Sequence, residues 1–158
     1  MQLTQETRNK IDAWLKKYPE DKKQSAVLPA LHIVQDEHDG WLSRECLDAV
    51  AEYLGMPAIA VYEVATFYNM FELKPVGKHK IHVCNSISCY LNGSEELIEH
   101  LEKRLGIKDG ETTKDGRFTL KEVECLAACT GAPACQINKK YYEGMTPEAI
   151  DKVLEGLE

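Results

Sequence analysis

The 158-residue sequence lacks several features that would each indicate a different class of protein. It has no run of the ~20 apolar residues that a helix needs to span a bilayer. Residues 1–8 lack the apolar core of a secretory signal, and their composition is not that of a mitochondrial transit peptide, which would be rich in Arg and Ser and free of acids. We therefore expect a soluble protein of the cytosol.

The sequence also lacks an excess of basic residues, internal repeats and low-complexity tracts. Its net charge of −7 would repel a phosphate backbone, so a nucleic acid is excluded as a partner. Six cysteines are present, and in a reducing compartment they favour metal binding or redox chemistry over disulfides.

Residues 1–74 have the periodicity of a small helical bundle. Ile11, Trp14 and Leu15 follow the spacing of one helix face, and Pro57 can open a fourth helix that carries the apolar run 61–71. At helical spacing we expect four residues of this run to face inward, namely Val61, Val64, Ala65 and Tyr68. That leaves an aromatic outer face, formed by Tyr62, Phe67 and Phe71, which predicts docking on a partner subunit; core packing alone is the alternative.

Residues 75–158 change to the pattern of a small α/β unit. A short strand over 80–83 ends at Cys84, a helix covers 94–104, and an alternating strand over 118–124 ends at Cys125. A hairpin over 134–143 and a helix starting at 146–147 complete the order β-α-β-β-α. This order resembles the core of a thioredoxin fold, so the predicted class is α+β: an N-terminal helical bundle, then a thioredoxin-like domain.

Four cysteines form two pairs at the ends of the two predicted strands: Cys84 and Cys89, then Cys125 and Cys129. Loops that leave neighbouring strands at one end of a sheet can converge. Two iron atoms need two thiolates each, and these spacings favour a [2Fe–2S] cluster. Structural zinc sites usually contain a Cys-x-x-Cys pair, which this chain lacks; zinc, disulfides and inert thiols remain alternatives.

Small polar residues surround these cysteines and predict hydrogen bonds to cluster sulfurs. Asn85, Ser86, Ser88 and Gly93 are expected in the first loop, and residues 130–131 in the second. Four thiolates without a histidine ligand favour a low reduction potential, near ~−400 mV. We expect the other two cysteines, Cys46 and Cys135, to be structural, and His82 not to be a ligand.

These motifs resemble the thioredoxin-like [2Fe–2S] subunit of respiratory NADH:quinone oxidoreductase (complex I). The resemblance rests on Val83-Cys84-x4-Cys89, on Glu124-Cys-Leu-Ala-Ala-Cys-Thr-Gly-Ala-Pro133 and on Val61-Tyr-Glu-Val-Ala-Thr-Phe-Tyr-Asn-Met-Phe71. Leu28-Pro-Ala-Leu31 and Gly40-Trp-Leu42 add to it. The family's second cysteine loop often contains glycine, whereas this chain has Leu126-Ala-Ala128, and alanine at a position that requires a positive φ would be strained.

The resemblance implies that Cys84, Cys89, Cys125 and Cys129 bind one [2Fe–2S] cluster. It implies a helical domain over 1–74 for partner docking and a thioredoxin-like [2Fe–2S] domain over 75–158. The cluster would exchange single electrons with the FMN of an adjacent subunit that binds NADH. This chain has no glycine-rich dinucleotide fingerprint, which agrees with NADH and FMN being bound by that partner.

The implied protein is thus a non-NADH-binding subunit of an oxidoreductase and translocase, with no catalytic residues of its own. It would lie on the cytoplasmic face of a bacterial inner membrane, attached through the complex and not inserted. The same subunit type in a soluble NAD-coupled hydrogenase or formate dehydrogenase is a close alternative. A free ferredoxin-like carrier and a zinc-stabilised interaction module are more distant ones.

Overall fold

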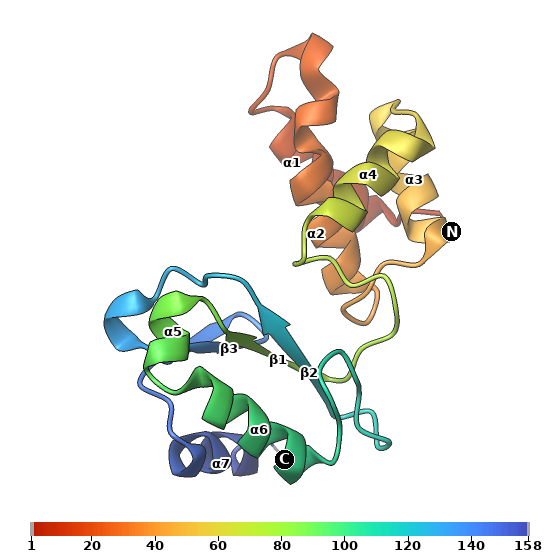
Figure 1. Cartoon of the computed structure of the whole chain (residues 1–158). Coiled ribbons are helices and arrows are strands. Elements are labelled where there is room, and N and C mark those ends of the chain that lie inside the picture. The colour runs from red at the N-terminus through yellow and green to blue at the C-terminus, as the bar shows by residue number, and fades with distance from the viewer. Residues whose placement is uncertain (1, 158) are drawn as a thin grey trace. The chain divides into compact units, whose positions relative to one another are not determined.

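The computed structural model describes residues 2–157 and divides into two compact units, Met1–Pro75 and Val76–Glu158. The described part of the first unit is helical (Figure 1). Its elements are α1 (Gln5–Leu15), the 3-10 helix η1 (Glu20–Ala26), α2 (Val27–Glu37), α3 (Arg44–Leu54) and α4 (Ala58–Phe67). None of the helices within residues 2–157 has the length and apolar character needed to cross a bilayer.

Local signals explain where the helices of the first unit begin and end. Ser43 caps α3, because its side chain accepts a hydrogen bond from the backbone N–H of Cys46, and Gly55 ends the helix at a φ of 65°. Pro57 directly precedes α4. The helices enclose one apolar core, which includes Ile11, Leu31, Val34, Leu42, Val50, Leu54 and Val61.

The predicted orientation of the run 61–71 is partly wrong. Val61 and Ala65 are buried as expected, but α4 ends at Phe67 and the backbone of Tyr68 is extended. Helical spacing therefore does not apply to the last residues of the run. Tyr68 is 37% exposed instead of inward-facing, whereas Phe71 is only 4% exposed and belongs to the core.

The buried side chain of Gln35 holds the segment that follows α4. Its Nε2 donates to the carbonyl of Met70 at 3.1 Å, and its Oε1 accepts from the backbone N–H of Glu72 at 2.7 Å. This pair of hydrogen bonds satisfies two backbone groups of the non-helical segment that follows α4. It also keeps Phe71 directed into the core.

The second unit is a four-stranded sheet with helices. Its elements are β1 (His79–Cys84), α5 (Ile87–Leu91), α6 (Ser94–Leu105), β2 (Phe118–Val123), the 3-10 helix η2 (Cys129–Gly131), β3 (Cys135–Ile137), β4 (Lys140–Tyr142) and α7 (Pro147–Glu155). The strand order is β2-β1-β3-β4, with β1 and β2 parallel and the other pairs antiparallel. The predicted α+β class is confirmed.

Alternating residues of the strands form the core of this unit together with α6 and α7. Figure 1 shows both helices on the same side of the sheet. Their buried side chains, including Leu97, Leu101, Ile150 and Leu154, pack with strand residues, including Ile81, Val83, Leu120 and Ile137. The cysteine loops follow the C-terminal ends of β1 and β2.

Candidate metal centre

The ends of β1 and β2 position the two cysteine pairs. The strands are parallel, and Cys84, the last residue of β1, pairs with Val123, the last residue of β2. The backbone N–H of Asn85 continues the ladder by donating to the carbonyl of Val123 at 3.1 Å. Cys125 follows two residues later, so both loops leave the sheet at the same end.

The first pair is buried. Cys84 and Cys89 are each 2% exposed and pack with Ala134. The sequence predicts a loop around them, but residues 87–91 form the short helix α5, which contains Ser88 and Cys89. The Tyr90 N–H donates to the Ser86 carbonyl at 2.9 Å, which closes the first turn of α5. Five residues are too few to show helical periodicity, so the sequence carries no clear signal of α5.

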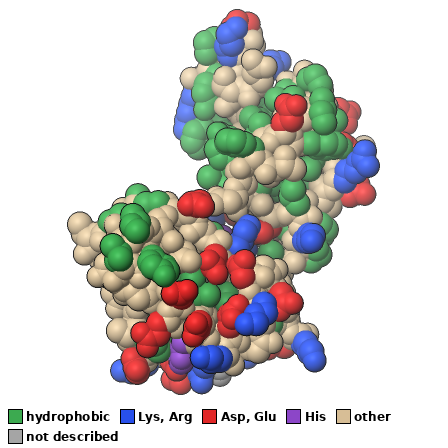
Figure 2. Space-filling model, in the orientation of Figure 1, with side chains coloured by type: hydrophobic (Ala, Val, Ile, Leu, Met, Phe, Trp, Pro, Cys, Tyr) green, Lys and Arg blue, Asp and Glu red, His purple; other side chains and the backbone are tan. Residues whose placement is uncertain are grey.

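The outer side of α5 is apolar. Ile87, Tyr90 and Leu91 are 70%, 48% and 74% exposed, while Cys89 of the same helix is buried. Figure 2 shows hydrophobic side chains gathered over the segment that Figure 1 labels α5. A candidate ligand therefore lies directly behind an exposed hydrophobic surface, hereafter the α5 face.

Backbone donors surround the buried thiols. Burial alone would raise the pKa of Cys84, but hydrogen bonds from the backbone of Ser86 and Leu126, and then from Cys89, outweigh it and lower that pKa. Burial raises the pKa of Cys89 in spite of a hydrogen bond from the backbone of Ala134. The charges of neighbouring thiolates act in the same direction as burial. The environment therefore favours the anionic form of Cys84, the form that binds metal.

The second pair is exposed. Between Cys125 and Cys129, Ala127 has a φ of +58°, the left-handed conformation that is strained for alanine. In this conformation its backbone N–H donates to Cys125 Sγ at 3.3 Å. The strained residue thus provides a donor to a candidate ligand.

Hydrogen bonds join the two loops. The Cys84 N–H donates to the Ala134 carbonyl at 3.1 Å, and the Ala134 backbone in turn bonds Cys89. Leu126, from between the second pair, bonds the sulfur of Cys84. Cys89 also interacts electrostatically with both Cys84 and Cys129. The fold therefore brings both pairs to one end of the sheet.

The donor set fits a binuclear cluster better than a single ion. Within residues 2–157 no three Cys, His, Asp or Glu side chains converge as ligands of one metal ion. A structural zinc ion would need four ligands at one point. A [2Fe–2S] cluster needs two pairs of thiolates and benefits from N–H donors to sulfur, which both loops supply.

The two remaining cysteines lie in apolar cores, as expected. Cys135 is fully buried in β3, and burial raises the pKa of its thiol to about 12. Cys46 is fully buried in α3, where its Sγ accepts a hydrogen bond from Ser43 Oγ at 3.3 Å. Both are therefore structural.

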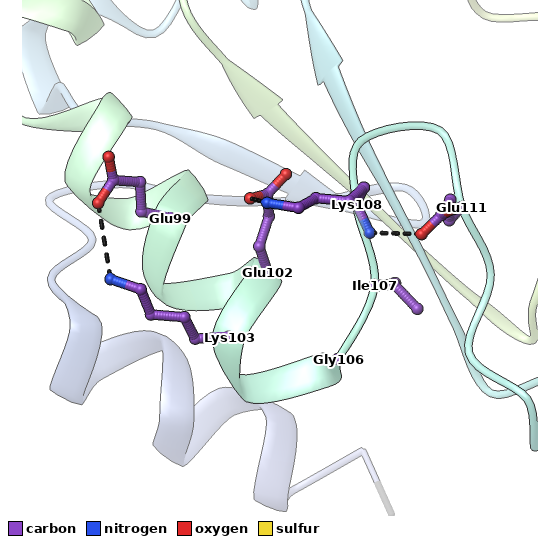
Figure 3. A pocket seen from close by; sticks show the side chains of 7 residues that line it. All are labelled: Glu99, Glu102, Lys103, Gly106, Ile107, Lys108 and Glu111. Atoms are coloured by element: carbon purple, nitrogen blue, oxygen red, sulfur yellow. Dashed lines mark hydrogen bonds and ion pairs between the residues drawn. The ribbon is translucent and has the colours of Figure 1, made fainter.

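The second unit also has a surface hollow between the end of α6 and the following loop (Figure 3). It contains none of the cysteines. Its charges are paired: Lys108 Nζ contacts Glu102 at 2.6 Å, and Lys103 lies 3.7 Å from Glu99. Glu111 accepts from the backbone N–H of Lys108 at 2.7 Å. The charged side chains that line this hollow therefore contact one another or the backbone.

Comparisons with known proteins identify the family of the chain. The model of the thioredoxin-like [2Fe-2S] ferredoxin family matches residues 11–158. The E subunit of NADH-quinone oxidoreductase from Rickettsia bellii is 49% identical over 143 residues, which cover 90% of this chain and 86% of that protein. An E subunit of NADH-quinone oxidoreductase from Rhizobium meliloti is 45% identical over 148 residues, with coverages of 94% and 86%.

Among solved structures, an NAD+-reducing [NiFe]-hydrogenase in the air-oxidised state matches 89% of this chain with a TM-score of 0.72. The identity is 23% and the match covers 24% of the hydrogenase chain, so it shows a shared fold. The family match, by contrast, spans nearly the whole sequence, from within α1 to the end. The chain belongs to the thioredoxin-like [2Fe–2S] ferredoxin family.

Proposed function

We propose that this chain is the electron-transfer subunit of an NADH:quinone oxidoreductase and holds one [2Fe–2S] cluster on Cys84, Cys89, Cys125 and Cys129. The observation that carries the proposal is the convergence of two thiol pairs at the end of β1 and β2, with backbone N–H groups directed at their sulfurs. The relatives that are E subunits of NADH-quinone oxidoreductase support the assignment to that complex.

A bound [2Fe–2S] cluster supplies a one-electron redox site. This chain's residues hold the thiolates and stabilise their negative charge through the N–H donors of both loops. The buried pair and the side chains of Leu126 and Ala134 limit the access of water to one side of the site. The protein thereby sets the environment of the redox centre, while the redox chemistry belongs to the cluster.

We propose that a partner subunit binds NADH and FMN and that single electrons pass between its flavin and this chain. NADH delivers two electrons as a hydride, and iron–sulfur centres accept one, so a flavin beside such a centre connects the two. The assembly is a hetero-oligomer that attaches to the cytoplasmic face of the membrane through its other subunits.

Two exposed surfaces are candidates for contact with that partner. The α5 face lies over Cys89, and electron transfer requires a short path between the redox centres. In the first unit, Phe67 is 80% exposed at the end of α4, and Ile59 of the same helix is 63% exposed. Exposed aromatic and aliphatic side chains of this kind are typical of interface cores.

The alternative is the equivalent subunit in a soluble NAD-coupled hydrogenase or formate dehydrogenase. Part of an NAD+-reducing hydrogenase has the same fold as this chain, and we therefore retain this alternative. Both assignments give the chain the same cluster and the same kind of flavin partner. They differ in the final electron acceptor, which the genes next to this one would identify.

Low-temperature EPR of the anaerobically purified full chain tests the proposal. We expect a [2Fe–2S] signal after dithionite reduction that is absent in the oxidised protein. Cys84→Ser, Cys89→Ser, Cys125→Ser and Cys129→Ser should each damage or abolish the signal, whereas Cys135→Ser, which alters a core thiol, should retain it. Stoichiometric zinc without iron, or full cluster occupancy in any of the four variants, would refute the assignment.

A further inference from the structure

The side chain of Glu143 lies directly against Gly131 in the second cysteine loop. A Cβ at position 131 would come within 2.6 Å of Glu143 Cβ and 2.8 Å of its Cδ, closer than such atoms approach in proteins. Only glycine therefore allows Glu143 to occupy this place. Gly131 is the last residue of η2, which begins with the candidate ligand Cys129.

Backbone hydrogen bonds fix this arrangement. The Gly144 N–H donates to the Gly131 carbonyl at 2.7 Å, and the Met145 N–H donates to the Pro133 carbonyl at 3.1 Å. The segment 143–145 thus runs along the loop 131–133. The same loop continues to Ala134, whose backbone bonds Cys89. Glu143 is consequently held beside a loop that touches both cysteine pairs.

Glu143 is exposed, and a negative charge at this place opposes the addition of an electron to a nearby redox centre. Glu143 is not a ligand and belongs to neither cysteine loop. Its charge is placed there by the turn between β4 and α7, in which Gly144 has a φ of 60°. The structure thus provides, against the second cysteine loop, a carboxylate that metal ligation does not require.

We propose that Glu143 is a non-ligating residue that lowers the reduction potential of the cluster through its charge. The inference rests on the proposed cluster. It adds a residue outside the ligand set that helps to determine the driving force for electron transfer. Its neutral isostere, glutamine, keeps the size of the side chain over Gly131 and removes the charge. Electron uptake by the variant is therefore easier than by the wild-type protein.

The test is an EPR-monitored redox titration of the full chain, with dithionite as the electron donor and each oxidised cluster taking up one electron. At a fixed potential we expect Glu143→Gln to raise the ratio of reduced to oxidised protein about threefold. This corresponds to a positive shift of ~28 mV at 59 mV per tenfold change for one electron. Glu143→Lys should shift the potential further in the same direction.

Glu155→Gln is the matched control, because it removes the same charge at the last residue of α7. Raising the ionic strength from 0.1 M to 1 M shortens the screening length from ~10 Å to ~3 Å. It should therefore reduce the Glu143→Gln shift, whereas a purely structural effect would not depend on salt.

A Glu143→Gln shift no larger than that of Glu155→Gln, a shift that does not depend on salt, or loss of the cluster from Glu143→Gln would overturn the electrostatic role. These results would leave the proposed function intact if the wild-type chain shows the [2Fe–2S] signal. Absence of that signal from the wild-type protein would instead refute the proposed function, and this inference with it.

Discussion

Ala127 has a left-handed backbone conformation between two candidate ligands, and the residue after it provides a matched comparison. Ala127 has a φ of +58°, whereas Ala128 has a φ of −112°. The left-handed conformation costs an L-residue roughly 1–2 kcal/mol, and glycine avoids this cost while losing about 0.5–1 kcal/mol in chain entropy.

We therefore expect opposite effects of the same substitution at the two positions. Ala127→Gly should raise the free energy of unfolding by about 0.5–1 kcal/mol, and Ala128→Gly should lower it by a similar amount. Urea unfolding of the iron-free protein would measure both. Equal destabilisation by the two substitutions would show that residue 127 is not strained in solution.

His79 gives the second unit a stability that depends on pH. It is 9% exposed, and Asn138 Nδ2 lies 3.1 Å from its Nδ1. Burial, followed by the charge of Lys78, lowers the pKa of His79. The unfolded chain then binds a proton more readily than the folded one once the pH falls below ~6.5, so acid favours unfolding. Above that range His79 is neutral in both states and its effect disappears.

Urea unfolding at pH 5.5 and pH 7.5 would test this expectation. The wild-type protein should lose more of its free energy of unfolding at pH 5.5 than His79→Gln, which keeps a hydrogen-bond acceptor but cannot be protonated. Equal losses in the two proteins would assign the acid sensitivity to other groups.

At the scale of elements, the end of α4 separates two phenylalanines that the sequence places in one run. Phe71 is 4% exposed and Phe67 is 80% exposed. Phe71→Ala should lower the free energy of unfolding by about 3–5 kcal/mol because it leaves a cavity. Phe67→Ala should change it by less than about 0.5 kcal/mol and should weaken binding to the proposed partner, the flavoprotein subunit that binds NADH and FMN.

Urea unfolding and a binding assay with the flavoprotein subunit would measure the two effects. Unchanged binding of Phe67→Ala would contradict the proposed docking role of α4. Tyr62→Phe provides a control on the same helix, because it keeps the aromatic ring and removes the hydroxyl that contacts Asp48 and Arg44.

Elements with a clear local pattern are predictable from the sequence, and contacts between distant residues are not. Ser43 and Gly55 mark the ends of α3, and the apolar alternation before Cys84 and Cys125 marks β1 and β2. The short α5 has no periodic pattern, so the sequence predicts a loop in its place. The orientation of Phe71 depends on where α4 stops, which Gln35 of another helix stabilises.

In the candidate site, too, local features are predictable from the sequence and contacts between distant residues are not. The four cysteines can be named from their spacing, because each pair is local and follows a strand. The donors to their sulfurs are predictable only in part: Ser86 is expected from its place beside Cys84 and does bond it, whereas Leu126 and Ala134 contact cysteines of the other pair only in the folded chain. Glu143 approaches Gly131 through a turn twelve residues later, and a lone glycine gives no sign of that contact.

At the scale of the whole molecule, the two units have separate hydrophobic cores. The four candidate ligands all belong to Val76–Glu158. A unit of this size can bury enough apolar surface to fold alone. We therefore expect the fragment 76–158 to fold and to hold the cluster, and its affinity for the flavoprotein subunit to fall because α4 is missing.

Circular dichroism and EPR of the fragment would test whether it folds and holds the cluster. A binding assay that compares the fragment with the full chain would test the expected loss of affinity. A fragment that is unfolded, or folded without the cluster, would show that the helical unit contributes to the site. Wild-type affinity of the fragment would place the whole docking surface in the second unit.

The register of β1 and β2 has a consequence for how the length of this chain can vary in evolution. The pairing of Cys84 with Val123 is set by the strands, and the residues 106–117 between α6 and β2 lie outside them. Insertions there would lengthen a surface loop and leave the cysteines in place. One extra residue between Val123 and Cys125 would instead displace Cys125 relative to Cys84, whose position β1 sets. Natural length differences should therefore collect in the first segment and be absent from the second.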